Sequence, residues 1–187
     1  MNLFQEAFQR QLEKHKVFVS YYHNDDQRYR DAFEKHFGSL FISKSVQPGD
    51  IDTDVGDEYV KHLIQDDYLD DASVIIVLVG PKTLGRKHVD WEISAGLNKK
   101  VGGYSGLMAI LLPEYRLSVD GKYQYDEIPA RLADNVKTDY AKVYTWAWLC
   151  ADAQRVKNAI QTAFDDRIKK ADKIDNSRKQ MQGDTCS

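Results

Sequence analysis

A carboxylate and an imidazole stand four positions apart in the segment HVDWEISAGL. If this segment is a helix, His88 and Glu92 share one of its faces, because side chains four residues apart are neighbours on a helix surface. The two groups could then line one wall of the same pocket. Trp91 would point about a quarter-turn away from Glu92, which favours a place in the core. The spacing alone does not separate a reactive pair from an exposed helical Glu beside a structural His.

A second group of candidates follows the first apolar run of the chain. Ser20, Tyr21 and Tyr22 come at the end of the segment KVFVSYY, which is typical of a short strand. Hydroxyl and backbone groups at such a place can bind a phosphate or a ribose, and an aromatic ring can stack on a base. We expect one of the two tyrosines to be buried in the core instead.

Two further sets of residues could bind a metal, and neither has the full pattern. Asp50, Asp52 and Asp54 lie in the segment VQPGDIDTD, but DxDxD alone lacks the glycine and the terminal glutamate of a calcium loop. Cys150 and Cys186 are far apart, and neither belongs to a CxxC pair. We therefore expect a solvated, mobile loop around the aspartates, no metal site and no disulfide bond.

Strands and helices alternate along most of the sequence. The run SVIIVLVG is typical of a strand that is buried on both faces of a parallel sheet. The expected strands are 17–21, 40–42, 73–80, 107–112 and 142–145, and the expected helices are 24–37, 56–64, 87–99 and 151–170. This alternation predicts an α/β fold of the flavodoxin-like kind, with a central parallel five-stranded sheet and helices on both faces. Because such sheets bind ligands at the carboxyl ends of their strands, function should lie just after Ser20, Ser43, Gly80 and Leu112.

The length and composition predict one domain with extensions at both ends. A chain of 187 residues with 42% hydrophobic residues can bury one core. We expect residues 1–15 to form an amphipathic helix, residues 16–170 to form the domain, and residues 171–187 to form a polar, disordered tail. A net charge of −3 without a basic cluster argues against nucleic acid as a partner. No apolar run approaches the roughly 20 residues that span a bilayer, and no signal-peptide pattern is visible, so we expect a cytoplasmic location.

Three common α/β families are excluded by the residues that follow the strands. A phosphate-binding P-loop needs GxxxxGK[ST], and a dinucleotide fold needs GxGxxG after its first strand, whereas this chain has SYYHNDD there. A response-regulator receiver needs an aspartate at the end of its third strand, but this strand ends in VLVG. None of these three chemistries is expected.

Four segments, in the correct order, resemble the TIR family. The segment VFVSYYHNDD is similar to the TIR opening, VQPGDIDTD stands where TIR domains carry a mobile loop, DDASVIIVLVGPKT resembles their third strand, and HVDWEISAGL resembles the helix that follows. The resemblance runs from about Lys16 to Lys100 and continues more weakly to Phe164, and it implies a TIR-like fold. The VDWE form of the helix motif and the SVIIVLVGPKT strand are most similar to the TIR-like subunits of the bacterial Thoeris anti-phage defence system.

This resemblance implies an enzyme that uses NAD. TIR enzymes carry a catalytic glutamate four residues after an aromatic, which places Glu92 in the catalytic position and His88 in the position usually held by Trp. The substrate-binding candidates are then Ser20, Tyr21, Tyr22, Phe41 and His88. NAD would be the substrate, so no cofactor is expected. On phage infection the product would be a cyclic ADP-ribose isomer, a diffusible nucleotide signal that activates a separate effector protein, and the resemblance also allows a homo-oligomer.

Two departures from the family pattern and two competing interpretations accompany this prediction. His88 replaces the Trp that the family carries four residues before the catalytic glutamate, and Tyr22 stands where an arginine would bind phosphates. Hydrolysis of NAD should therefore be slow or depend on a trigger. Cyclisation needs water kept away from the reacting ribose, and tyrosines could line such a pocket. The main alternative is a non-enzymatic TIR scaffold that signals through protein contacts. A generic flavodoxin-like nucleotide-binding domain is disfavoured by the missing phosphate loop.

Overall fold

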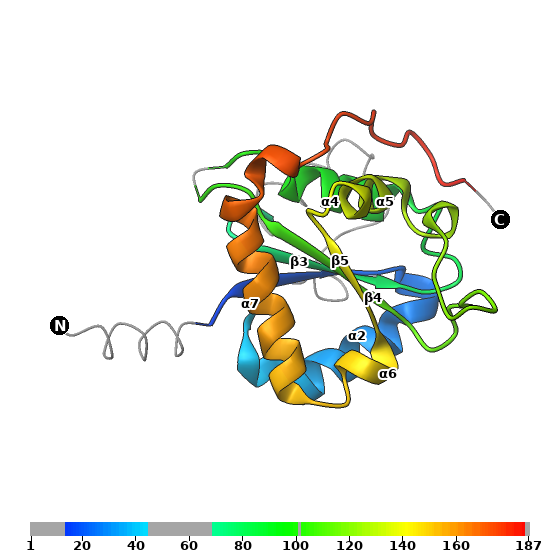
Figure 1. The fold of residues 1–187 in the computed structure, drawn as a ribbon. Helices are drawn as coiled ribbons and strands as arrows, with labels where there is room; N and C mark the ends of the chain where they lie inside the picture. The colour runs from blue at the N-terminus through cyan, green and yellow to red at the C-terminus, as the bar shows by residue number, and fades with distance from the viewer. Residues whose placement is uncertain (1–13, 45–68, 101, 186–187) are drawn as a thin grey trace.

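A parallel sheet of five strands forms the centre of the molecule (Figure 1). The computed structural model of the chain describes residues 14–44, 69–100 and 102–185. The strands are β1 (Lys16–Ser20), β2 (Ile42–Ser43), β3 (Val74–Val79), β4 (Gly106–Leu111) and β5 (Lys142–Thr145). They lie in the order β2-β1-β3-β4-β5, and all neighbouring pairs are parallel. The predicted α/β fold with a flavodoxin-like and TIR-like sheet is confirmed.

Helices cover both faces of this sheet. The described part of the chain contains α2 (His23–Phe37), α4 (Lys87–Gly96), α5 (Ala130–Lys137), α6 (Trp146–Leu149) and α7 (Ala153–Lys169), with 3₁₀ turns η1 (Gly38–Leu40), η3 (Tyr125–Glu127) and η4 (Ala171–Lys173). Helices α4 and α5 lie on one face, and α2, α6 and α7 lie on the other (Figure 1). None of these described helices is long and apolar enough to cross a membrane.

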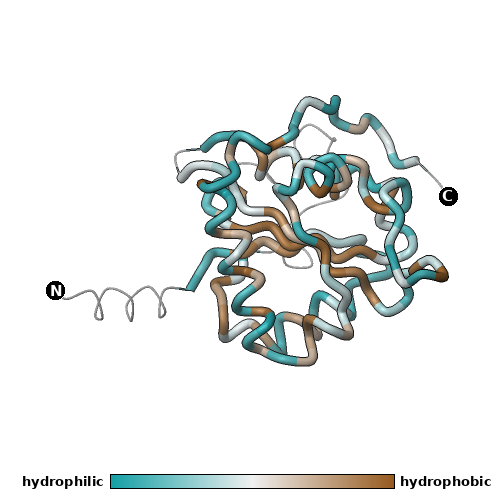
Figure 2. The backbone as a smooth tube through the Cα atoms, in the orientation of Figure 1, coloured by the Kyte–Doolittle hydropathy of each residue, from teal (hydrophilic) through white to brown (hydrophobic). Residues whose placement is uncertain are grey.

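Strand β3 forms part of two hydrophobic cores. Successive side chains of a strand point to opposite faces of its sheet. Ile75 and Val77 therefore pack in the core under α4 and α5, whereas Val74 and Ile76 pack in the core under α2 and α7. All six residues of β3 are buried, and hydrophobic residues concentrate along the central strands (Figure 2). The continuous apolar run in the sequence is explained by this burial on both sides.

Four elements differ from the sequence prediction, among them the short helix α6 (Trp146–Leu149), which was not expected. Helix α4 ends at Gly96 and not at Lys99, because the Gly96 carbonyl accepts a hydrogen bond of 2.9 Å from the Ser105 amide and so connects the helix to the approach of β4. Strand β2 contains only Ile42–Ser43, because a 3₁₀ turn occupies residues 38–40. Helix α5 was not expected, because two of its buried residues, Arg131 and Asn135, are polar.

The expectation of a disordered C-terminal tail is wrong for residues 171–185. This segment has little regular structure, but it lies along the outer side of α4 and α5 (Figure 1, red). Its polar side chains bind there: Arg178 pairs with Asp134 at 2.8 Å, and Asn176 Nδ2 donates to the carbonyl of Ser94 at 3.0 Å. A segment that docks through hydrogen bonds carries no hydrophobic periodicity, so the sequence pattern could not reveal it.

Some predicted features lie outside the described residues. These are the N-terminal helix, of which only Lys14 and His15 are described, the loop that carries Asp50, Asp52 and Asp54, and the helix expected over 56–64.

Candidate active site

The order of the strands defines the edge of the sheet where a ligand is expected. The chain passes from β1 outward to β2 and then returns to β3 on the other side of β1, so the topological switch point lies between β1 and β3. Open α/β sheets bind ligands outside the carboxyl ends of the strands at this point. Ser20 is the last residue of β1 and pairs in register with Val77 of β3. The candidate site is therefore the region beyond Ser20.

Glu92 is placed at this region by the inward face of α4. Its side chain is only 4% exposed, and Ser20 Oγ donates a hydrogen bond of 2.5 Å to Glu92 Oε2. The two residues come from separate candidate groups in the sequence, and the fold brings them into direct contact. Glu92 and Ser20 therefore form the centre of the candidate site.

Burial sets the protonation state of this carboxyl group. Removal from water disfavours the charged form and raises the pKa of Glu92 from 4.5 to about 8, while the hydrogen bond from Ser20 acts in the opposite direction and only partly offsets the burial. Glu92 is consequently protonated in most molecules at neutral pH. A strongly shifted carboxyl group beside the switch point of a parallel sheet is a physical indication of a functional site.

The two tyrosines after β1 have different environments. Tyr21 is buried, its hydroxyl donates to Gln27 Oε1 at 2.6 Å, and its ring stacks on His23 at 4.3 Å. This confirms that one of the pair belongs to the core. Tyr22 is half-buried, and the guanidinium of Arg86 lies 3.9 Å from the centre of its ring. Of the two, Tyr22 is the one able to present a ring or hydroxyl to a ligand.

His88 and Phe41 were also predicted to bind substrate. His88 is half-buried one turn before Glu92 and makes an edge contact with Trp91, with 5.0 Å between ring centres. Phe41 is 2% exposed and packs on Phe33 of α2, in the core on the other face of the sheet from α4. The fold therefore does not bring Phe41 to the side of the sheet that carries Glu92, and we assign it to the core.

Trp91 has the buried position that its helical spacing predicts. It is 4% exposed, and its indole N–H donates to the carbonyl of Met181 at 2.8 Å. The C-terminal segment provides this acceptor, so the polar end of the ring is satisfied within the protein.

Asp26 and Arg86 are residues of this edge that the sequence did not single out. Asp26 stands in the first turn of α2, but it does not cap the helix, whose N-cap is Tyr22 and makes no side-chain cap bond. The Asp26 carboxylate is instead buried at the end of β3, where it accepts a hydrogen bond of 3.2 Å from Thr83 Oγ1. Burial raises its pKa to about 6. In the sequence, Arg86 was indicated only indirectly, because the segment GPKTLGR follows the carboxyl end of β3, where ligands of parallel sheets bind.

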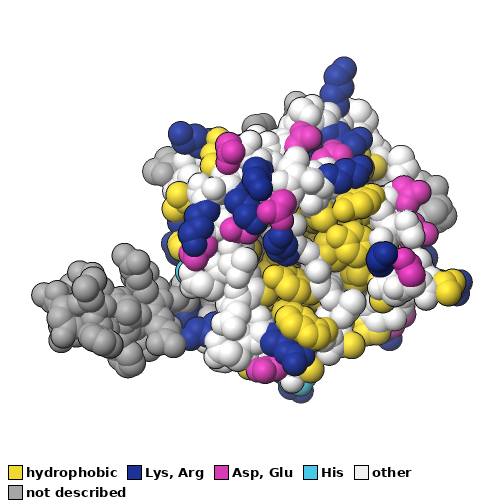
Figure 3. All heavy atoms as spheres, viewed as in Figure 1, with side chains coloured by type: hydrophobic (Ala, Val, Ile, Leu, Met, Phe, Trp, Pro, Cys, Tyr) yellow, Lys and Arg dark blue, Asp and Glu magenta, His cyan; other side chains and the backbone are white. Residues whose placement is uncertain are grey.

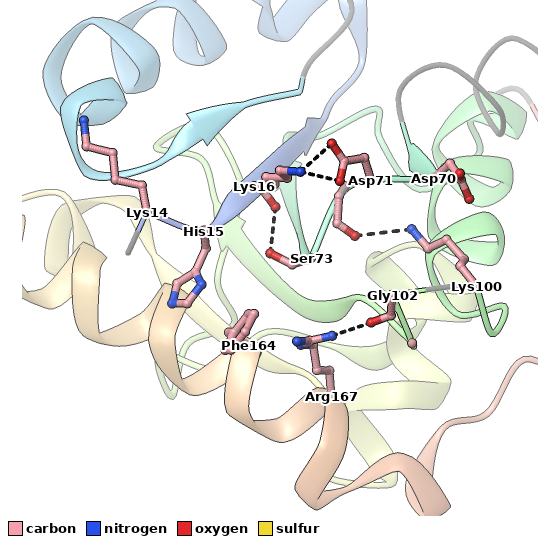
Figure 4. A pocket seen from close by; sticks show the side chains of 12 residues that line it. Lys14, His15, Lys16, Asp70, Asp71, Ser73, Lys100, Gly102, Phe164 and Arg167 are labelled. Atoms are coloured by element: carbon pink, nitrogen blue, oxygen red, sulfur yellow. Dashed lines mark hydrogen bonds and ion pairs between the residues drawn. The ribbon is translucent and has the colours of Figure 1, made fainter. Parts of the chain in front are cut away.

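Two hollows in the described structure lie away from Glu92. One, of about 640 Å³, opens at the amino ends of the strands, where Lys16 binds Asp71 and Arg167 donates to the carbonyl of Gly102 (Figure 4). The other, of about 370 Å³, lies beside β5 and is lined by Tyr123 and Tyr144 among others. Hydrophobic side chains gather on this face of the molecule (Figure 3). Neither of these two hollows is lined by Glu92.

The region around Glu92 and Ser20 falls inside a recognisable family. Residues 18–116 match the sequence model of the family described as Thoeris protein ThsB, TIR-like domain. The chain belongs to this family. The match covers β1 to β4 and therefore includes the Glu92 and Ser20 contact, but it stops before α5 and the C-terminal segment. No curated protein matches the chain.

Membership of the ThsB TIR-like family assigns the chain to Thoeris anti-phage defence at the level of the system. It also shows that the TIR resemblance of the four sequence segments is a real relationship.

Proposed function

We propose that the protein uses NAD to make a cyclic ADP-ribose-type signal that activates a separate effector protein. The observation that carries this proposal is the buried hydrogen bond between Ser20 and Glu92 at the switch point of the sheet. A carboxyl group with a strongly raised pKa in this position is suited to acid–base chemistry near neutral pH.

The chemistry follows from charge. Cleavage of the bond between nicotinamide and ribose expels a neutral ring and builds positive charge on the ribose, so an ionised carboxylate nearby lowers the barrier. The nicotinamide ring of NAD is itself cationic, and a cation close to Glu92 would favour its ionised form. Substrate binding and ionisation of Glu92 would thus support each other. A ribose hydroxyl could then attack in place of water, provided that the site stays closed.

Tyr22 and His88 are the residues best placed to bind the rest of the substrate. Both are half-buried. Tyr22 follows Ser20 by two residues, and His88 precedes Glu92 by one helical turn, so each is close in sequence to one partner of the buried hydrogen bond. Arg86, which lies over Tyr22, adds a positive charge to the same edge. A guanidinium there could bind a phosphate of the substrate, a role that the sequence analysis considered for the groups at the end of β1 but not for Arg86.

The test is the small-molecule content of cells that express the protein, measured by mass spectrometry with and without phage. Glu92→Gln removes the ionisable group at nearly constant size, and Glu127→Gln makes the same change on an exposed 3₁₀ turn as the control. We expect a cyclic ADP-ribose species, with loss of NAD, in infected cells that express the wild type or Glu127→Gln, but not in those that express Glu92→Gln.

One observation favours a second candidate, a TIR scaffold that signals through protein contacts. Glu92 is 4% exposed and protonated in most molecules at neutral pH, as expected for a group with a structural role. In that case the metabolites would stay unchanged, and Glu92→Gln would keep full protection against phage. This pair of results would refute the enzyme and leave the scaffold.

A further inference from the structure

The C-terminal segment, residues 174–185, docks on the helix that carries Glu92. It lies beyond the part of the chain that matches the family and contains neither helix nor strand. In its middle, the Met181 amide donates to Asp90 Oδ2 at 2.9 Å, and the Met181 carbonyl accepts from Trp91 at 2.8 Å. Asn176 also binds the Ser94 carbonyl. The segment therefore follows the outer face of α4 over about two turns.

The end of the segment binds the start of α4. Asp184 accepts hydrogen bonds from the Lys87 amide at 2.8 Å and from Arg86 Nη1 at 3.1 Å, and the Thr185 amide donates to the Gly85 carbonyl at 2.9 Å. Arg86 is the N-cap residue of α4 and makes no side-chain cap bond. A carboxylate at this point satisfies a free amide of the first turn and interacts favourably with the helix dipole. Asp184 thus supplies the cap that the local sequence of α4 lacks.

The electrostatics of Asp184 agree with a bound carboxylate. Partial burial favours the neutral form, but the hydrogen bonds from Lys87 and Arg86 outweigh it and hold the pKa of Asp184 below its usual value. The contact therefore persists at neutral pH, and it is lost only when the segment moves away or the carboxylate is removed.

The residues that bind this segment also border the candidate site. Arg86 lies over the ring of Tyr22, and Trp91 contacts His88. The segment binds the outer face of α4, while Glu92 projects from the inner face toward Ser20. Any movement of α4 that exposes Glu92 must therefore break or strain the contacts of the segment.

The segment is held mainly by polar contacts. Ile174 is its one residue packed against the hydrophobic core within the described structure, and the side chains from Gln182 to Thr185 are exposed. Partly exposed hydrogen bonds stabilise little individually, and regions with few buried apolar contacts open locally without global unfolding. The segment can consequently detach while the sheet and its two cores stay folded.

We propose that the C-terminal segment is an inhibitory latch, which holds α4 in the position that buries Glu92 and whose release from the start of α4 lets the helix move so that Glu92 meets the substrate. This role rests on the enzyme function proposed above for Glu92. It explains how a glutamate that is only 4% exposed in the described structure can act on a dinucleotide, and it locates the control outside the part of the chain that the family match covers.

The test is hydrogen–deuterium exchange of the full chain, combined with an NAD cleavage assay on the same proteins. Asp184→Ala removes the acceptor of two hydrogen bonds, and Asp172→Ala removes a carboxylate from the exposed side of η4 as the matched control. We expect amide exchange in residues 87–93 to become at least about fivefold faster in Asp184→Ala, because loss of a charge-assisted bond shifts local opening by at least this factor. NAD cleavage should rise in parallel, and Asp172→Ala should match the wild type in both measurements.

The possible results separate the latch from the enzyme function. Unchanged exchange in α4, both in Asp184→Ala and in a chain that stops after Lys173, would overturn the latch even if the wild type cleaves NAD. Faster exchange with slower NAD cleavage would also overturn it, because the segment would then support activity. Faster exchange with no cleavage by any variant would support the release of α4 and count against the enzyme function itself. Circular dichroism of each variant confirms that the fold is intact.

Discussion

Replacement of Glu92 by Gln should stabilise the protein increasingly as the pH rises. Glu92 is buried, and its pKa is about 8 in the folded protein against 4.5 as the reference value. Between these two values the folded state binds a proton that the unfolded state has released, so the free energy of unfolding of the wild type falls as the pH rises. Gln carries no ionisable group and escapes this loss.

The size of the effect follows from the same two pKa values. Each unit of difference corresponds to about 1.4 kcal/mol, so the full loss between pH 4.5 and 8 approaches about 5 kcal/mol. Between pH 5 and pH 7 the expected gain of Glu92→Gln over the wild type grows by about 2 to 3 kcal/mol. Any change in hydrogen bonding to Ser20 adds an offset at each pH but does not alter this slope.

The assay is urea unfolding followed by circular dichroism at pH 5, 6, 7 and 8, with Glu127→Gln as the control on an exposed turn. Asp26, whose pKa burial raises to about 6, titrates in the wild type and in both variants and cancels in the comparison. A stability difference between wild type and Glu92→Gln that stays constant from pH 5 to pH 8 would refute the reasoning, because it would mean that Glu92 is already ionised in the folded protein.

Two further predictions concern the site and the packing of the sheet. Ser20→Ala removes the hydrogen-bond donor that favours ionised Glu92, so the pKa of Glu92 should rise further. The rising limb of kcat/KM for NAD, plotted against pH, should then move to higher pH. An unchanged midpoint would contradict the contact between the two side chains. In Gly106→Ala a β-carbon would stand 2.0 Å from the Ala163 carbonyl oxygen, so α7 must move off β4 at a cost of about 1–3 kcal/mol; urea unfolding that matches the wild type would show that this approach is looser.

Apolar patterning predicted the centre of the fold well. Strand β3 is one unbroken apolar run because both of its faces are buried, and β5 occupies the expected residues 142–145. Helix α5 was missed because its buried face depends on a tertiary contact: Arg131 Nε donates to Asp90 Oδ1 of α4 at 2.9 Å. Helix α5 is also only eight residues long, so the helical spacing of Leu132 and Val136 covers too few turns to predict it.

The sequence predicted where the residues of the candidate site lie in the fold, but it did not predict their burial or their contacts. Helical spacing put His88 and Glu92 on one face, and strand topology put Ser20 at the correct edge of the sheet. The burial of Glu92 and its contact with Ser20 arise from how α4 packs on β1, which no local pattern specifies. Phe41 shows the opposite case, because a position near the end of a strand does not decide which face of the sheet a side chain joins.

The strand order also has a consequence for how the chain acquires its structure. The residues of β1 are synthesised early, but Val17 pairs with Val74, which is far away in the sequence. The unit β3-α4-β4 closes a shorter loop, because Val74 pairs with Gly106. Long-range parallel pairing is slow, because the entropy of loop closure is lost before the contacts form. During synthesis on the ribosome, the apolar residues 17–19 therefore stay exposed to solvent until β3 has been synthesised and can pair with them. We infer that the unit β3-α4-β4 folds first and that β1 then pairs with β3. Before this pairing the nascent chain would be most prone to aggregate.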